Sequence, residues 1–295
     1  MKKLFTNQLG AMRRRQIGTV CAFTLTELLA VIGTTAVLAA VLLSVSFTTR
    51  ERVERAQCTD NLRQIAIGWN IYQQEFNQVM PCHWPGITSS GPAAAPWRTY
   101  EIYHVVPGTG QITIGDGADS PTAPSGPWNL GSLFATKLVP NPRVFYCPSL
   151  ARIDSLYSYD YYATISNSWP STPVRTGDDK IRTGYNYYPQ LLGIAQIGPS
   201  LFAPKAAVTP SKWTELDTKK SIVTDLVFST QTIPHLASGS IAGLNALFPD
   251  SRVVFQNARS NPQAFNSQLW GSTGFPNSIG ENGANFRYVM SLWRP

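Results

Sequence analysis

At 295 residues the chain can form one substantial domain with extensions or two small domains. Its formal net charge of +7 would suit a nucleic-acid or anionic-membrane partner, but five of the 24 basic residues lie within residues 1–22, where no acidic residue occurs. The other 19 basic residues stand against 17 acidic ones, which leaves +2 for the rest of the chain. Because charge gathered in a short leader is typical of a membrane-topology signal, the composition argues against a nucleic-acid partner.

Residues 1–22 form a basic leader, and residues 23–47 form an apolar segment whose one charged residue is Glu27. About 20 apolar residues span a bilayer, so this segment predicts a transmembrane helix. It is too long for the apolar core of a secretory signal peptide, which has about 7–15 residues. The basic leader predicts that the N-terminus stays in the cytoplasm, that the chain crosses the membrane once, and that the body lies on the other side. A carboxylate in such a helix predicts either a charged partner or a side chain that reaches the headgroups.

Residues 48–80 predict an amphipathic continuation of this helix. Apolar side chains recur here at spacings of three and four, and no proline occurs before Pro81. The pattern predicts one helix over residues 24–76 whose second half packs on a head along a single stripe. The predicted stripe consists of Val53, Ala56, Leu62, Ile65, Ala66, Trp69, Tyr72 and Phe76.

Residues 81–295 form the predicted head. Residues 82–130 are rich in Pro, Gly, Ser and Thr and predict long loops. Further on, SIVTDLVF (221–228) predicts a strand, and NALFPDSRVVFQ (245–256) predicts a β-hairpin. Ser251 in its turn adopts a left-handed conformation less readily than Gly. A hairpin and a further strand beside a long helix predict an α+β fold, with the helix packed on an antiparallel sheet.

The cysteines are Cys21 in the leader and Cys58, Cys82 and Cys147 in the remainder. No Cys-x-x-Cys pair occurs, so a zinc ribbon is not predicted. In an exported body, three cysteines predict one disulfide and one free thiol; three separate thiols are the alternative. We favour a disulfide between Cys58 and Cys147, which would tie the helix to the head, with Cys82 as the competing partner.

Few residues of the sequence are candidates for catalysis or for binding a metal or cofactor. His235, Asp225 and Asp250 are the strongest catalytic candidates, but three histidines without a His-x-His or His-x-x-x-His pair do not predict a catalytic metal. Neither a Gly-x-Ser-x-Gly motif nor a phosphate-binding glycine loop occurs. Asp116 and Asp119 lie in Gly-rich sequence that predicts a turn rather than a calcium site. We therefore predict no enzyme, metal or cofactor, and a structural role for His235 and Asp250 in hydrogen-bonding loop backbone.

The start of the apolar segment resembles the cleavage motif of type IV prepilins and type II secretion pseudopilins. That motif has a basic leader that ends in a small residue, then a Phe and, four residues later, a Glu; here these are Ala22, Phe23 and Glu27. The resemblance implies that a prepilin peptidase cuts between Ala22 and Phe23 and N-methylates Phe23. It also implies that Glu27 pairs with the terminal amine of a neighbouring subunit during assembly. Ala22 departs from the usual Gly.

Segments of the body resemble the large pseudopilin-like proteins of planctomycete- and verrucomicrobium-type bacteria. These segments are residues 58–76, 144–149, 185–187, 221–225 and 235–255. The last segment resembles a family pattern in which a His precedes a hairpin: His235, Gly243, Asn245 and Asp250 match it, while Ser251 replaces the usual Gly.

The resemblance implies a pilin-like fold and a structural subunit of a type II secretion or type IV pilus-related machine. Such a subunit sits in the bacterial inner membrane with its head in the periplasm, or at the cell surface after assembly. Implied partners are prepilin peptidase, other pilin-like subunits, the inner-membrane assembly platform and the lipid bilayer. The alternative function is a membrane-tethered surface protein that captures a polymer or carbohydrate through aromatic loops. Tyrosines in residues 157–162 and 185–188 are its candidates, although such side chains also cover half-buried strands.

Overall fold

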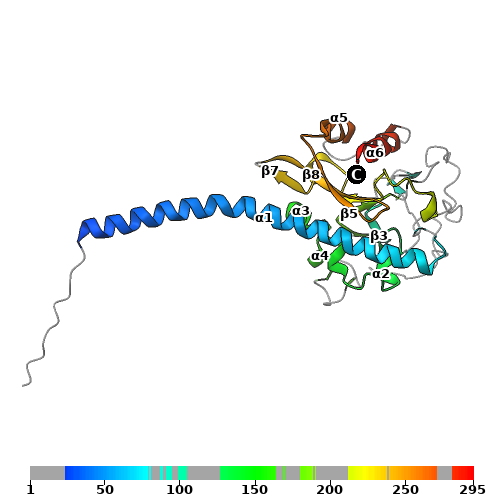
Figure 1. Cartoon of the computed structure of the whole chain (residues 1–295), viewed down its shortest axis with the longest axis horizontal. Helices are drawn as coiled ribbons and strands as arrows, with labels where there is room; N and C mark the ends of the chain where they lie inside the picture. The colour runs from blue at the N-terminus through cyan, green and yellow to red at the C-terminus, as the bar shows by residue number, and fades with distance from the viewer. Residues whose placement is uncertain are drawn as a thin grey trace, which may run out of the picture. The chain divides into compact units, whose positions relative to one another are not determined.

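The fold comes from a computed structural model of the chain (Figure 1). The structure describes residues 24–78, 80, 87–88, 91–94, 99–104, 127–163, 169, 180–188, 190, 212–237, 239–270 and 281–295. Two compact units divide the chain, Met1–Phe47 and Thr48–Pro295. The boundary between them lies where the apolar segment of the sequence ends.

The longest element is helix α1, Leu25–Glu75. A capping box starts it: the Thr24 hydroxyl accepts a hydrogen bond from Glu27 N (3.2 Å), and Glu27 Oε2 accepts one from Thr24 N (2.9 Å). Beyond its last turn, Asn77 and Gln78 have φ of 53° and 66°, the left-handed conformation that commonly closes a helix. The predicted helix is one residue longer at each end than the observed one.

The remaining elements are short. The strands are β1 Ile87–Thr88, β2 Gly91–Ala94, β3 Glu101–His104, β4 Lys180–Arg182, β5 Tyr185–Tyr187, β6 Val223–Asp225, β7 His235–Ala237, β8 Ser240–Leu247 and β9 Val253–Asn257. The α-helices are α2 Gly131–Ala135, α3 Pro148–Ile153, α4 Tyr159–Ala163, α5 Ser267–Trp270 and α6 Glu281–Leu292. The 3-10 helices are η2 Pro142–Phe145, η3 Ser155–Tyr157, η4 Trp213–Glu215, η5 Thr230–Thr232 and η6 Pro262–Phe265.

The main sheet has five antiparallel strands with β8 at its centre. Strands β6 and β7 share one edge of β8, and β9 pairs with the other edge, while β5 extends the sheet beyond β6. Strands β8 and β9 form the predicted hairpin, with Leu247 opposite Val253. Ser251 takes φ of 67° in the turn, and its hydroxyl accepts a hydrogen bond from Asn70 Nδ2 of α1 (3.0 Å). This contact with the helix offsets the conformational cost that the sequence predicts for a serine here.

Helices pack on both faces of this sheet (Figure 1). On one face Leu62, Ile65 and Trp69 of α1 share a core with the tyrosines of β5, and the Trp69 ring lies 5.2 Å from that of Tyr187. On the other face α5 and α6 pack against alternate side chains of β8. The expected α+β architecture, a long helix on an antiparallel sheet, is confirmed. Residues 82–130, expected to form long loops, contain β1, β2 and β3, and residues 105–126 lie outside the described residues. The tryptophan-rich layer of α5 and α6 was not predicted.

The buried stripe of α1 differs from the predicted one. Leu62, Ile65, Ala66 and Trp69 are buried as expected. Toward the N-terminus the stripe continues through Glu54 and Cys58, whereas the predicted Val53 is 51% exposed. Ala56 and Phe76, also predicted in the stripe, are exposed as well. The reason is geometric: steps of three or four back from Leu62 reach Cys58 and Glu54, and Val53 falls on a neighbouring face. The strand predicted over residues 221–228 is shorter in the structure, where it comprises only β6, Val223–Asp225.

None of the described helices combines the length and apolar composition that a bilayer crossing requires. The apolar segment predicted to span a membrane starts at Phe23, which lies outside the described residues, as do the side chains of residues 42–48.

Candidate functional site

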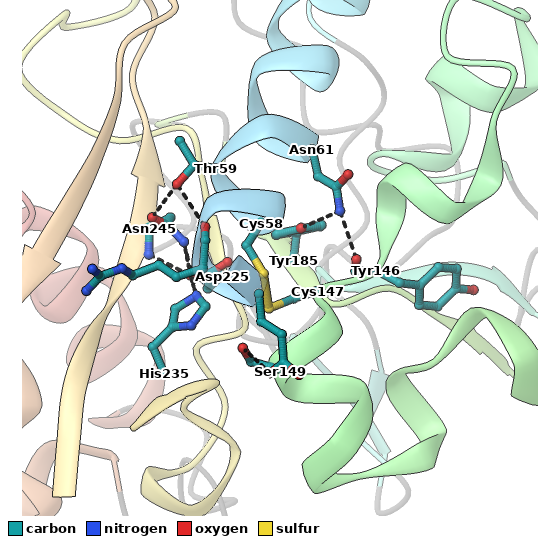
Figure 2. The surroundings of a disulfide bond; sticks show 12 residues. Cys58, Thr59, Asn61, Tyr146, Cys147, Ser149, Tyr185, Asp225, His235 and Asn245 are labelled. Carbon is teal, nitrogen blue, oxygen red and sulfur yellow. Dashed lines mark hydrogen bonds and ion pairs between the residues drawn. A yellow bond between two sulfur atoms is a disulfide. The ribbon is translucent and has the colours of Figure 1, made fainter. Parts of the chain in front are cut away.

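A disulfide lies at the centre of the contact between α1 and the head. It joins Cys58, in the C-terminal half of α1, to Cys147, the residue that precedes α3 (Figure 2). Both cysteines are fully buried, and their Cα atoms are 5.2 Å apart. The structure thus adopts the pairing that the sequence analysis favoured. Cys82, the competing partner, lies outside the described residues.

A buried histidine lies beside the disulfide (Figure 2). His235, at the start of β7, places Nδ1 2.9 Å from Glu51 Oε1 of α1 and Nε2 3.1 Å from Asp225 Oδ2 at the end of β6. The side chains of His235 and Asp225 are both 0% exposed, and Glu51 is 19% exposed. The imidazole therefore connects the helix to two strands of the sheet.

Strand β8 holds the carboxylate of Asp225 in place. Asp225 Oδ2 accepts hydrogen bonds from the backbone N of Asn245 (2.5 Å) and from its Nδ2 (3.0 Å). Asn245 Oδ1 in turn accepts a hydrogen bond from the hydroxyl of Thr59 on α1 (3.1 Å). Asp225 Oδ1, in contrast, is buried and has no hydrogen-bond partner among the described residues. A buried carboxylate oxygen without a partner is unusual in a native fold.

His235 carries a positive charge near neutral pH. Burial by itself lowers the pKa of an imidazole, but the charge and hydrogen bond of Asp225, and then those of Glu51, outweigh it and raise the pKa of His235 from 6.5 to about 9. Both ring nitrogens therefore carry protons, and they donate to Glu51 and Asp225. Because a protonated Nε2 has no free lone pair, Asn245 Nδ2, 3.1 Å away, donates to Asp225 rather than to the ring.

A second polar cluster surrounds Glu54, which lies about one helical turn before Cys58 on α1. Glu54, 7% exposed, accepts a hydrogen bond from Ser149 Oγ (3.1 Å) and forms ion pairs with Arg50 Nε (2.8 Å) and Arg152 Nη2 (3.2 Å). Arg152 also pairs with Glu51 (3.3 Å). Ser149 and Arg152 belong to α3, which directly follows Cys147. Both acids on this side of α1 are thus matched by charges or donors of the head.

Further along α1, Asn61 forms the last polar contact before the apolar stripe. Its Nδ2 donates to the carbonyl of Tyr146 (3.0 Å) and to Tyr185 Oη (3.3 Å), as Figure 2 shows. The buried phenol of Tyr185 has a raised pKa, first because of burial and then because of the nearby Asp225 charge. Residues 51–61 of α1 are therefore joined to the head by polar and covalent contacts; we call this stretch the polar clamp.

The predicted catalytic candidates separate in the structure. His235 and Asp225 meet, whereas Asp250 lies in the β8–β9 turn, where its carboxylate accepts hydrogen bonds from Arg252 N (3.2 Å) and Arg252 Nε (2.6 Å). We expected His235 to hydrogen-bond loop backbone, but its ring nitrogens contact the side chains of Glu51 and Asp225 instead. Asn245, which matches the family's hairpin pattern, lies in β8 and donates to Asp225.

Sequence reasoning missed Glu51 and Glu54 as partners of the head. The signal was available, since Glu51, Glu54, Cys58, Leu62, Ile65 and Trp69 follow one another at spacings of three and four. The predicted stripe contained only apolar residues and left both acids out, because charged residues are rarely buried unless they are paired. Their partners lie about 100 to 184 residues away in the sequence and could not be inferred from spacing.

The tyrosines proposed for polymer capture are mostly part of the core. Tyr157, Tyr162, Tyr185 and Tyr187 are each no more than 4% exposed. The Tyr162 hydroxyl donates to the carbonyl of Leu156 (2.9 Å), a contact within the head. These four side chains cover strands and helices, which is the alternative that the sequence analysis left open.

The residues of the cleavage motif are only partly described. Ala22 and Phe23 lie outside the described residues. Glu27 is exposed in the first turn of α1, where it forms the capping box with Thr24.

Among the described residues, one group has the ligand types and spacing to hold a metal ion. It consists of Cys58, Cys147, Asp225 and His235, whose ligand atoms all lie within 4.8 Å of one another. With the disulfide intact, the two sulfur atoms are bonded to each other.

The second half of α1 and the first part of the head match a protein family. The family described as "Protein of unknown function (DUF1559)" matches residues 48–195, which is half of the chain and begins where the second compact unit begins. The matched segment contains both cysteines of the disulfide together with Glu51 and Glu54, and it ends before β6 and β7. Neither a curated protein nor a solved structure matches the chain.

Proposed function

The chain belongs to the DUF1559 family, and we propose that it is a membrane-anchored, pilin-like subunit of a type II secretion or type IV pilus-related machine. In this proposal prepilin peptidase removes residues 1–22, and the apolar part of α1 first anchors the subunit in the inner membrane. The head lies in the periplasm. The partners are the peptidase, other pilin-like subunits and the assembly platform of the inner membrane.

The observation that carries the proposal is the position of α1 relative to the cleavage motif. The helix begins at Leu25, the third residue after the expected cut, and runs without interruption to Glu75. Its side chains Leu62, Ile65 and Trp69 lie in the core that it shares with the head. An anchor that served only to tether a domain would need no such continuity. A helix that is at once anchor and core element suits a subunit that assembles through its N-terminal half.

The side chains of the N-terminal half add support. From Leu25 to Val41 every side chain of α1 is exposed, and most are apolar, including Leu25 (76%), Val37 (66%) and Leu38 (63%). Exposed apolar surface of this extent is costly in water, because burying it is worth about 25 cal/mol per Å². Lipid, or the same segment of neighbouring subunits, would cover it.

Glu27 has two explanations that make different predictions. As a capping-box residue it stabilises the start of α1 and acts through its hydrogen bond to Thr24 N. As an assembly residue it acts through its charge, which pairs with the new amine of Phe23 on a neighbouring subunit. Glutamine separates the two, since it preserves a capping box but carries no charge.

The test therefore compares Glu27→Gln with Thr24→Ala in cells that lack the native copy. We expect Glu27→Gln to be processed normally but to lose assembly, measured as filament or secretion yield. Thr24→Ala removes the cap and keeps the charge of Glu27, so this variant should retain most of the assembly yield. Full assembly by Glu27→Gln together with a loss in Thr24→Ala would show that Glu27 only caps the helix, and would remove the charge-pairing argument.

A further inference from the structure

We propose that, once the Cys58–Cys147 disulfide is reduced, the two cysteines join Asp225 and His235 to form a buried zinc site. The inference concerns the second compact unit, Thr48–Pro295, and does not depend on how the chain is anchored. Each of the four residues comes from a different segment: α1, the turn before α3, β6 and β7.

The spacing fits a tetrahedral ion. Zinc binds sulfur at about 2.3 Å and nitrogen or oxygen at about 2.0–2.2 Å, so its ligand atoms lie roughly 3.3–3.8 Å apart. The four candidate atoms here lie within 4.8 Å of one another. Reduction lets the two sulfur atoms move apart to that separation, so small side-chain shifts complete the geometry.

The surroundings already orient the ligands. Metal-bound histidines usually donate their other ring N–H to a carboxylate, which fixes the tautomer. Glu51 occupies that position, 2.9 Å from His235 Nδ1, and leaves Nε2 directed toward the other three ligands. Asn245 holds Asp225 through Oδ2, while Oδ1 has no hydrogen-bond partner among the described residues. A bound ion would supply the partner that this oxygen lacks.

The donor set selects the class of ion. Two thiolates with one imidazole favour a soft or borderline ion such as Zn²⁺ and disfavour Ca²⁺ and Mg²⁺, which prefer oxygen. Burial of all four residues suits a closed structural site. Two cysteines 89 residues apart lack the Cys-x-x-Cys spacing of a zinc ribbon, which explains why no local zinc motif marks the site.

The two states exclude each other, because each sulfur bonds either to its partner or to the ion. A phosphine reductant converts the disulfide and one water into two thiols and a phosphine oxide. Zn²⁺ then displaces both thiol protons and the proton on His235 Nε2, and its charge balances the two thiolates. A disulfide oxidant that accepts two electrons reverses the sequence and releases the ion. The head would thus be held together by zinc in a reducing compartment and by the disulfide in an oxidising one.

The test measures Co²⁺ binding to the full-length chain in detergent, before and after phosphine reduction. Co²⁺ occupies zinc sites and reports thiolate ligands by a charge-transfer band and tetrahedral geometry by its visible absorption. A Cys21→Ser/Cys82→Ser background leaves only the two cysteines of the site. We expect one Co²⁺ per reduced chain, displaced by Zn²⁺, and no thiolate band in the oxidised chain.

Variants then identify the ligands and their support. Cys147→Ser and Asp225→Asn should weaken or abolish the band, and Glu51→Gln, which leaves all four ligands in place, should weaken affinity about 10–100-fold. Asp250→Asn is the matched control and should change neither the thiolate band nor the affinity for Co²⁺. No thiolate band in the reduced background chain would overturn the proposal. So would binding that is equal in the oxidised chain or that survives Cys147→Ser. This comparison of one polypeptide in two redox states holds even if a variant fails to fold.

Discussion

Two consecutive stretches of α1 attach it to the head by different physical means. The polar clamp, residues 51–61, uses a disulfide, ion pairs and hydrogen bonds. The stretch that follows, residues 62–69, uses close packing of Leu62, Ile65 and Trp69 against the sheet. Apolar burial is strong but non-directional, whereas hydrogen bonds weaken steeply when their geometry is lost. The difference suggests that the apolar stretch supplies most of the attachment energy and the clamp fixes the rotation and register of the helix.

The clamp also lies near the start of the second compact unit. Glu51 and Glu54 fall within about two helical turns of Thr48, where that unit begins, and the side chains of both acids contact Ser149 of the head. Directional and covalent contacts at this position would keep this part of α1 attached to the head.

Removal of the disulfide should have the largest effect on stability. The bond joins residues 89 apart, and a closed loop of about this length restricts the unfolded chain enough to contribute about 4–5 kcal/mol. We expect Cys58→Ala/Cys147→Ala to lower the free energy of unfolding by that amount in urea titrations without added metal. Cys82→Ala is the control and should leave it unchanged. A loss below about 1 kcal/mol would mean that the clamp does not depend on its covalent bond.

Loss of the buried Asp225 carboxylate should have the second largest effect on the free energy of unfolding. Asp225→Asn leaves the charged His235 without its fully buried partner and weakens the hydrogen bond to Asn245 N. Breaking a buried pair on one side typically costs about 3–5 kcal/mol. The matched control is Asp250→Asn, which removes a partly exposed pair with Arg252 and should cost about 1 kcal/mol or less. Equal effects of the two variants on the urea midpoint would contradict a special role for the Asp225–His235 pair.

A smaller effect is expected in the apolar stretch. Gly68 faces Val139 so closely that an added methyl group would overlap its Cγ2 atom, so Gly68→Ala should cost about 1–3 kcal/mol by overpacking. Gly33, also in α1, has nothing within 4 Å of the equivalent position and provides the control. We expect Gly33→Ala to leave the thermal unfolding of the head unchanged. An unchanged midpoint for Gly68→Ala would show that α1 packs more loosely here than the structure indicates.

The same comparison explains what the sequence could predict. Leu62, Ile65 and Trp69 repeat with the helical period and are apolar, so their burial follows from local pattern alone. The hairpin was equally local, and its turn lies where the sequence placed it. The partners of Glu51 and Glu54 depend on which distant strands and helices come together. The sequence around His235, Asp225 and Ser149 does not indicate these contacts. Ser251 was a similar case, because the hydrogen bond from Asn70 that accompanies it spans 181 residues.

The most direct test of the proposed function is the N-terminus of the chain isolated from its own cells, determined by intact-mass and N-terminal peptide analysis. A pilin-like subunit should begin at Phe23 with one methyl group on its amine. A chain that still begins at Met1, or one cut inside the apolar segment after Ala40, would contradict the proposal.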